Sequence, residues 1–197
     1  MIKNSQPSVD SLEHALRLGG QLVENIAGPQ WDAPTPCSEW TVREVLAHVV
    51  GMNLVFAAML AGQRPPSSET DILGEDPAGA YARSAQLLLD AFGAPGALER
   101  SFQSPMGTAT GLERLQIRSY DLLAHLWDLA QATGQQLEND PVLQASAQQA
   151  LEFAGGQLAG VERAGRFAPP QPISATVPAL DQLAAFLGRP VTWSPNC

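Results

Sequence analysis

The sequence predicts an all-α protein, an up-down four-helix bundle with an additional helix and a short proline-rich C-terminal appendage. Apolar residues recur at helical spacing in several long segments, capping residues stand where these segments begin, and there is little strand signal. We therefore expect a single domain over residues 1–197. Residues 1–7 are expected to be a loose N-terminus, and residues 160–197 an appendage packed on the bundle.

Length, composition and charge limit the possible functions. A chain of 197 residues with 45% hydrophobic and 16% charged residues is long enough and apolar enough for one globular domain. Its formal charge of −9 argues against nucleic acid and anionic membrane surfaces as partners. The N-terminal residues lack the apolar run of a secretion signal, no stretch approaches 18 uninterrupted apolar residues, and Cys37 and Cys197 form no CxxC pair. A reduced, cytoplasmic protein is expected.

The first helix is predicted to begin near Asp10, because Asp10 and Glu13 resemble a capping box. Its apolar residues repeat at helical spacing as far as Ile26. His14 also lies on this helix, between Glu13 and Ala15, and we interpret it as a surface or rim residue.

The second helix is predicted between a proline-rich loop and a glycine. Residues 28–40 must form a loop because three prolines in nine residues forbid a helix, and we expect its two tryptophans to pin it to the body of the protein. Thr41 and Glu44 then form an S/T-x-x-E capping box, and Gly62 ends the helix.

The third and fourth helices have similar signals at their ends. Asp76-Pro77 opens the third helix, and residues 101–111 are expected to form a loop that can include a short extended piece near the mouth of a pocket. Thr110 and Glu113 form another capping box for the fourth helix, which Gly134 ends.

The remaining chain is predicted to hold a fifth helix and the appendage. Asp140-Pro141 opens the fifth helix, and Gly155-Gly156 weakens its end. The prolines of residues 167–174 require an extended segment, and residues 178–187 can form a short helix. Residues 189–193 are expected to fold back onto the bundle.

Candidate ligands for a metal ion stand on the second and fourth helices. Asp121 and His125 are four residues apart, which places both side chains on one helix face, one turn from each other. His48 lies on an otherwise apolar face of the second helix. Two histidines and one carboxylate on two helices can form a metal site with an open position.

The same residues have a simpler interpretation. A carboxylate and an imidazole four residues apart can only support the helix, by roughly 0.2–0.5 kcal/mol, and Asp128 could do the same with His125. His48 alone could be a hydrogen-bonded core residue. However, the leucines beside these residues face inward, and polar groups in a bundle interior need partners, which a shared metal would supply to all three.

Three segments of the chain resemble a known family. Residues 35–48, from Thr35 to His48, and residues 121–134, from Asp121 to Gly134, are similar to the two signatures of the mycothiol-dependent maleylpyruvate isomerase N-terminal-domain family. That family belongs to the DinB-like metal-binding helix bundles. The tail from Phe167 to Trp193 resembles the ending of a subfamily, so the resemblance covers nearly the whole chain.

This resemblance implies a divalent metal, usually zinc or nickel, held by His48, Asp121 and His125 with water completing the shell. Asp121 stands where the family's E-x-x-x-H pattern often has glutamate, so the carboxylate here is one methylene shorter. The isomerase itself also has a separate C-terminal domain that contributes to its active site, whereas this chain has a short proline-rich tail. The isomerase reaction is therefore not carried over.

Two functions of different classes follow. The first is a metal-dependent enzyme that uses a low-molecular-weight thiol such as mycothiol, an S-transferase or isomerase, with Arg118 and Trp127 as candidate cofactor-binding residues. Arg118 or Arg43 could hold an anionic substrate, although each could simply be a solvated charge. Tyr120 or Trp127 could line a pocket, although each could simply pack in the core. Asp128 could orient a ligand histidine. The second is a non-catalytic metal-binding or stress-response scaffold.

Partners follow from these hypotheses. A small-molecule substrate or thiol is expected, and a homodimer is a further possibility because bundles of this kind can pair through an exposed helix face. A third hypothesis is a purely structural bundle, in which hydrogen bonds satisfy the histidines.

Overall fold

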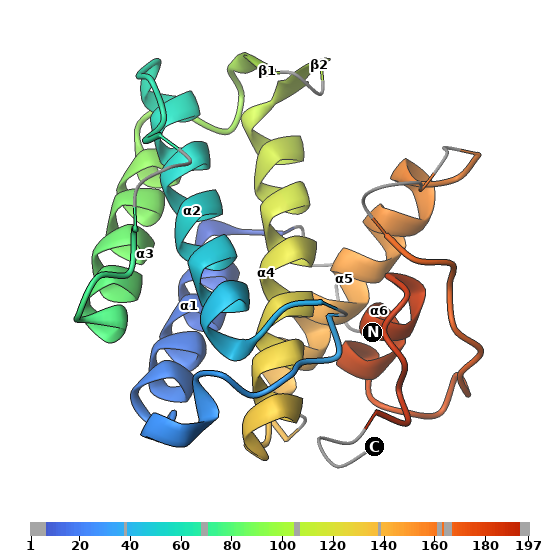
Figure 1. Ribbon diagram of the computed structural model, residues 1–197. Coiled ribbons are helices and arrows are strands. Elements are labelled where there is room, and N and C mark those ends of the chain that lie inside the picture. The colour runs from blue at the N-terminus through green and yellow to red at the C-terminus, as the bar shows by residue number, and fades with distance from the viewer. Residues whose placement is uncertain are drawn as a thin grey trace.

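Four helices follow one another around a bundle in the computed structural model (Figure 1). They are α1 (Val9–Glu24), α3 (Pro77–Gly93), α2 (Val42–Ala61) and α4 (Gly111–Thr133), in the order of their contacts. The structure describes residues 7–37, 39–67, 71–104, 107–137, 139–160, 163 and 167–193. The predicted all-α bundle is confirmed. The expected loose N-terminus, apart from Pro7, and Cys197 lie outside the described residues.

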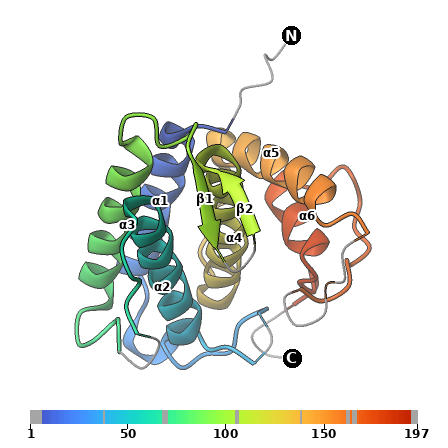
Figure 2. The same cartoon turned by 90° about the horizontal axis from the view of Figure 1, so that it is seen from above.

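Helix α4 lies at the centre of the molecule, with the bundle on one side and the C-terminal helices on the other (Figure 2). It contacts α1 and α2, and also α5 (Pro141–Gln157) and α6 (Ala179–Phe186). Its leucines Leu115, Leu122, Leu126 and Leu129 are fully buried. A helix that is packed on nearly every side can hold charged residues only where other elements supply partners.

The predicted ends of α2 and α4 are confirmed. The Thr41 hydroxyl accepts a hydrogen bond from the amide of Glu44, whose carboxylate accepts from the amide of Thr41, and the same reciprocal pair opens α4. Both helices end at a glycine in the left-handed region, Gly62 with φ 67° and Gly134 with φ 70°. These caps fix where each helix begins and ends, and so set the positions of the side chains between them.

The predicted capping pair of α1 is wrong. The helix begins at Val9, and its cap is Ser8, which accepts from the amide of Ser11 while the Ser11 hydroxyl bonds the Ser8 backbone. Serine at the third position replaces the glutamate of the usual capping box, so the motif at Asp10 and Glu13 was misleading.

Residues 101–111, expected to be a loop with a short extended piece, contain an antiparallel pair of strands. β1 (Ser101–Ser104) pairs with β2 (Gly107–Thr110), with Ser101 opposite Thr110. The strands are too short and too polar to give an alternating sequence signal. Buried Arg114 of α4 donates to the carbonyls of Phe102 and Gly107, which holds the strands above the start of α4.

Among the described residues, α2 is the one helix long and apolar enough to cross a membrane by length and composition. Half of its most apolar window is buried inside the protein. Val45, Leu46 and Val49 of this helix are fully buried in the core. A core helix of a bundle meets the same criteria, and α2 is such a helix here.

Helix α6 packs against α4 and α5 through its apolar face. Leu183 is fully buried, and the amide of Leu180 donates to the Gln144 side chain of α5 at 3.0 Å. After the helix, Gly188 has φ 91°, a left-handed conformation that suits glycine. This turn directs Arg189 toward α4.

A tight contact between α1, α3 and α4 predicts a large effect at Gly19. A methyl group at this position would collide with the hydroxyl of Tyr81 and lie 2.8 Å from Leu126 Cδ2. The hydroxyl donates to the carbonyl of Leu16, so the collision also threatens a buried hydrogen bond. Gly19→Ala should lower the free energy of unfolding by about 1–3 kcal/mol, measured by urea denaturation.

Gly20→Ala is the matched control on the same helix. Its new methyl group would lie 3.7 Å from Tyr81 Cε1, an ordinary contact. This variant should be as stable as the wild type or more stable by about 0.5–1 kcal/mol, since alanine favours a helix. Equal losses in the two variants would contradict the predicted collision.

Candidate metal centre

Three side chains converge between the neighbouring helices α2 and α4. His48 extends from α2, and Asp121 and His125 extend from successive turns of α4. The Nε2 atom of His48 lies 3.4 Å from Asp121 Oδ1, and the Nε2 atom of His125 lies 3.6 Å from the same oxygen. The structure thus brings together the three residues that the sequence predicts as metal ligands; metal binding by them stays a prediction.

The separation of His125 and Asp121 suits a shared ion better than a direct hydrogen bond, whereas His48 and Asp121 are within hydrogen-bond distance. A separation of 3.6 Å is too long for a good hydrogen bond. Ligand atoms at about 2.0–2.1 Å from a tetrahedral ion lie about 3.3–3.4 Å from one another, close to the observed separations. The donor set of two imidazoles and one carboxylate also suits zinc, nickel and similar divalent ions.

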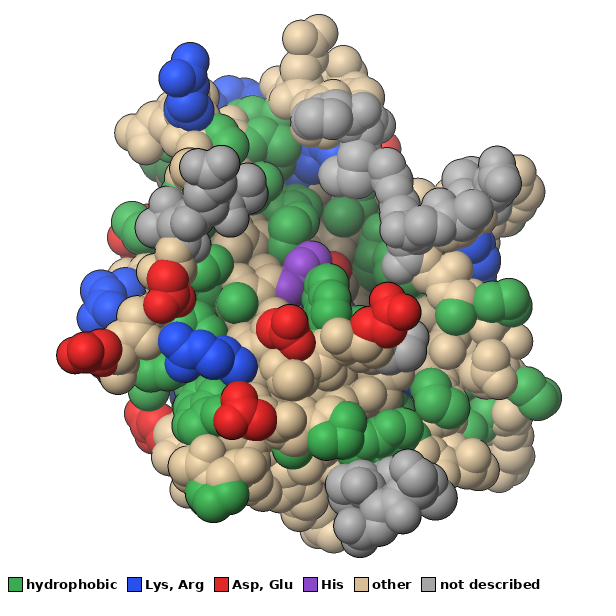
Figure 3. Space-filling model, in the orientation of Figure 1, with side chains coloured by type: hydrophobic (Ala, Val, Ile, Leu, Met, Phe, Trp, Pro, Cys, Tyr) green, Lys and Arg blue, Asp and Glu red, His purple; other side chains and the backbone are tan. Residues whose placement is uncertain are grey.

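One side of the cluster is open to solvent. The side chains of His48 and Asp121 are 28% and 19% exposed, whereas that of His125 is 7% exposed. Figure 3 shows histidine surface at the floor of a hollow on this face of the molecule. A small molecule can therefore reach the side of the cluster formed by His48 and Asp121.

Asp121 is held from behind by a buried arginine. The Nη1 atom of Arg118 lies 2.6 Å from Asp121 Oδ2, which leaves Oδ1 directed to the two histidines. The other nitrogens of Arg118 donate to Asn53 Oδ1, at 2.7 and 3.1 Å, and to the Val49 carbonyl. Arg118 is fully buried, so its interpretation as a solvated charge is wrong. A contact between Arg118 and a cofactor stays a prediction.

The electrostatics keep Asp121 ionised. Burial alone would raise the pKa of Asp121, but the hydrogen bond with His48, the neighbouring His125 ring and the Arg118 guanidinium outweigh it and hold the pKa below its ordinary value. A carboxylate that stays deprotonated is ready to bind a cation at neutral pH.

His125 is held by a second carboxylate. Its Nδ1 atom lies 3.0 Å from Oδ2 of Asp128, which is fully buried. When His125 Nδ1 carries the hydrogen and donates it to the Asp128 carboxylate, the Nε2 lone pair faces Asp121 and His48. This is the orienting contact that the sequence suggested for Asp128.

Two residues near the cluster were not predicted to belong to the site. The ring of Trp40 lies 4.9 Å from that of His48 and 5.8 Å from that of His125, between ring centroids, so Trp40 forms part of the wall of the site. Arg189 binds Asp128 with its Nη2 atom at 2.9 Å from Oδ2. Trp40 lies in the segment 35–48 and Arg189 in the tail 167–193, both of which resemble family segments, but neither resemblance indicated a contact with the cluster. The 61 residues between Asp128 and Arg189 gave no local signal that they would meet.

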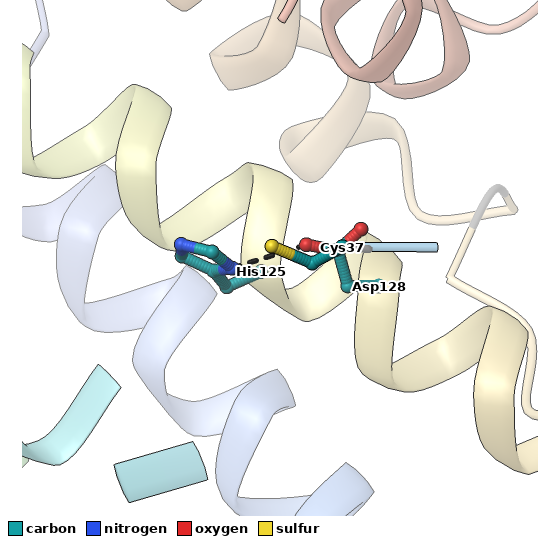
Figure 4. A group of neighbouring side chains, drawn as sticks. All are labelled: Cys37, His125 and Asp128. Carbon is teal, nitrogen blue, oxygen red and sulfur yellow. Dashed lines mark hydrogen bonds and ion pairs between the residues drawn. The ribbon is translucent and has the colours of Figure 1, made fainter. Parts of the chain in front are cut away.

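Cys37, His125 and Asp128 form a second group of possible metal ligands (Figure 4). Their donor atoms lie within 4.8 Å of one another. Burial, followed by the negative charge of Asp128, raises the pKa of the Cys37 thiol to about 11, despite the opposite effect of Arg189. The thiol is therefore protonated at neutral pH.

Several other candidate residues lie away from the cluster. Trp127 is two residues after His125, so it lies on another side of α4, where its Nε1 donates to Asp181 of α6 at 2.7 Å. Its cofactor-binding role stays a prediction. Arg43 is on the surface and donates to the carbonyl of Gly74.

The last two candidates also have partners elsewhere. The Tyr120 ring is buried and packs against the rings of Phe153 and Phe167. The Nε2 atom of His14 lies 2.9 Å from the carboxylate of Asp140, the cap of α5, which agrees with its interpretation as a rim residue.

A cavity of about 400 Å³ is lined in part by Ile117 of α4, which is one helical turn before Asp121. Residues of β2, α4 and α5 line it: Ala109, Glu113, Ile117, Glu152, Phe153, Gly156 and Gln157. Ile117 and Asp121 are four residues apart on α4, so their side chains are neighbours on one face, about 6 Å apart along the axis. Ile117 is thus the lining residue that lies nearest in sequence to the candidate ligand Asp121.

Fold and site together define a helix bundle with a His–Asp–His cluster that is open on one side. The sequence matches the model of the mycothiol maleylpyruvate isomerase N-terminal domain over residues 12–130, a span that includes His48, Asp121 and His125. The chain belongs to this family. The expectation from the sequence motifs is confirmed.

Relatives and solved structures agree with this assignment. Two uncharacterized proteins of Mycobacterium tuberculosis, from strains CDC 1551 / Oshkosh and ATCC 25618 / H37Rv, are each 38% identical to the chain over 171 residues, which is 86% of this chain and 91% of theirs. Crystal structures of the mycothiol-dependent maleylpyruvate isomerase and of a mutant of it share the fold, with a TM-score of 0.54 at 16% and 15% identity. The match covers 75% of this chain and 70% of the isomerase chain.

Proposed function

We propose that this protein is a metal-dependent enzyme that acts with a low-molecular-weight thiol such as mycothiol, as an S-transferase or an isomerase. One divalent ion, zinc or nickel, would be held by His48, Asp121 and His125. The convergence of both histidine Nε2 atoms on Asp121 Oδ1, within 3.6 Å and on the solvent side of the bundle, carries the proposal. We propose mycothiol as the thiol because the family is described as the N-terminal domain of mycothiol maleylpyruvate isomerase.

The protein's own residues prepare the site. A divalent ion with an open coordination position supplies a positive charge that keeps a bound thiol deprotonated at neutral pH. Arg118 orients the Asp121 carboxylate, and Asp128 orients His125. The ring of Trp40 limits access of water beside both histidines, because it lies against each of them.

The cavity beside α4 is where we place the remainder of the thiol or substrate. Its volume of about 400 Å³ falls within the usual range of small-molecule sites. Ile117 and Phe153 offer apolar contacts, while Glu152 and Gln157 offer hydrogen-bond acceptors. A molecule that occupied the cavity could extend one turn along α4 to reach Asp121.

The environment proposed for the protein follows from its charge. A net charge of −9 favours small-molecule partners over nucleic acid or an anionic membrane. We propose a cytoplasmic location, where low-molecular-weight thiols are kept reduced. A homodimer stays part of the proposal.

A thermal-shift measurement tests the thiol. In protein loaded with zinc, mycothiol at about 100 times its Kd should stabilise the fold by about 2.7 kcal/mol, which raises the Tm by about 5–10 °C for a domain of this size. Metal-free protein, and mycothiol whose sulfur has been alkylated, are the matched controls and should give little shift. An equal shift with alkylated mycothiol would contradict a role for the sulfur.

One observation favours the non-catalytic alternative, a metal-binding or stress-response scaffold. Among the described residues bonded around the cluster, Arg118, Asp128 and Arg189 are all engaged in buried ion pairs, which leaves them unsuited to transfer protons. If the protein binds metal but no thiol shifts its Tm, the scaffold becomes the better account.

A further inference from the structure

The two groups of possible metal ligands share His125. On one side of the ring, Nε2 faces Asp121, which also lies beside His48. On the other side, Nδ1 faces Asp128, and Cys37 lies close by (Figure 4). A cation bound to the second group would draw His125 toward that group and would introduce a thiolate ligand, which zinc favours strongly.

Arg189 already occupies the cation position of the second group. Its Nη2 atom lies 2.9 Å from Asp128 Oδ2, 3.5 Å from His125 Nδ1 and 3.6 Å from Cys37 Sγ. Its Nε atom donates to the other oxygen of Asp128 at 3.2 Å. A guanidinium is permanently charged in proteins, so a metal ion in the same place would meet strong repulsion.

The end of the chain holds Arg189 firmly in this position. The residue is 7% exposed, its amide donates to the Ala184 carbonyl at 2.9 Å, and its Nη1 donates to the Leu187 carbonyl. The preceding Gly188 passes so close to Ala168 that an added Cβ would lie 2.6 Å from the Ala168 carbonyl oxygen. The C-terminal appendage is thus built to present one side chain to α4.

We propose that Arg189 is a positioning residue of the metal site, which commits His125 to the group with His48 and Asp121. It fixes the Asp128 carboxylate that orients His125, and it excludes a cation from the group with Cys37. The C-terminal appendage thereby completes a site whose ligands all lie in the bundle. This inference rests on the proposed metal site.

Cobalt(II) tests the inference, because its absorption spectrum reports the ligand atoms. Wild-type protein should bind one cobalt ion without a cobalt–thiolate band in the near ultraviolet. In Arg189→Met the affinity for cobalt at the original site should fall about 10–100-fold, the usual effect of losing an outer-shell partner. Any thiolate band in this variant should disappear in the double variant with Cys37→Ser. Arg189→Lys keeps the charge and should recover part of the affinity.

Arg163→Met is the matched control. Arg163 also anchors the appendage, since it donates to the Phe186 carbonyl at 2.6 Å and stacks on the Phe186 ring, but the described contacts link it to α6 and not to Asp128. Its variant should keep wild-type cobalt affinity, and circular dichroism should show both variants folded.

The proposed role of Arg189 can fail separately from the proposed metal site. If Arg189→Met binds cobalt as tightly as the wild type, Arg189 does not position the site. A thiolate band in the wild type that Cys37→Ser removes would also overturn the inference. If the wild type binds no cobalt at all, the proposed metal site has failed instead, so the two failures are distinguishable.

Discussion

Arg118→Met should lower the free energy of unfolding of the metal-free protein by about 3–5 kcal/mol, the usual cost of removing one partner of a buried ion pair. Arg118 is fully buried and is held by Asp121, Asn53 and the Val49 carbonyl. Methionine has a similar length but cannot donate, so Asp121 Oδ2 and Asn53 Oδ1 lose their partner inside the protein. Urea denaturation in the presence of a chelator measures this loss.

Zinc should reduce the cost of this substitution. A cation beside Asp121 supplies part of the positive charge that Arg118 provided, so the loss should be smaller in zinc-loaded protein than in metal-free protein. Arg43→Met, which removes a surface arginine of α2, is the control and should change stability by less than about 0.5 kcal/mol. If zinc leaves the cost of Arg118→Met unchanged, the ion does not lie next to Asp121.

His48→Ala and His125→Ala should each weaken zinc binding by more than about 100-fold, because each removes one of three ligands and the loss should exceed that of an outer-shell partner. Competition with a chromophoric chelator gives the affinities. The effect of His125→Ala should be the larger, since His125 is buried and already oriented by Asp128.

The third histidine of the chain provides the control for this pair. His14 contacts the Asp140 carboxylate and is not one of the three candidate ligands. His14→Ala should therefore leave zinc affinity within about twofold of the wild type, well below the 10-fold effect of even an outer-shell partner. A histidine of the proposed site whose removal has as little effect as His14→Ala is not a ligand.

Local sequence signals predicted the helices and the ligand cluster well, because both depend on short-range geometry. The Thr41 cap and the Gly62 stop place His48 on the second turn of α2. The four-residue spacing of Asp121 and His125 then fixes their common face on α4. Once two helices pack side by side, these residues can meet.

The residues that surround the cluster could not be predicted in this way. Arg118 looks like an ordinary surface charge in the sequence, since nothing local shows that Asn53 of α2 will face it. Arg189 meets Asp128 through the path of the whole C-terminal appendage. Their positions depend on tertiary packing, which helical periodicity does not encode.

Short elements also escaped prediction for physical reasons. β1 and β2 have four residues each, too few for a clear alternation. The serine cap of α1 uses a hydroxyl where the usual motif has a carboxylate. Neither error affected the predicted positions of the candidate ligands, because the caps of α2 and α4 were predicted correctly.

Elemental analysis of the purified protein, prepared without an affinity tag, tests the central claim most directly. If His48, Asp121 and His125 form a metal site, the protein should contain about one equivalent of zinc, nickel or another divalent metal, and a chelator should remove it with loss of thermal stability. Protein that stays empty after divalent metals are added would contradict the claim, and the cluster would then be a hydrogen-bonded part of a structural bundle.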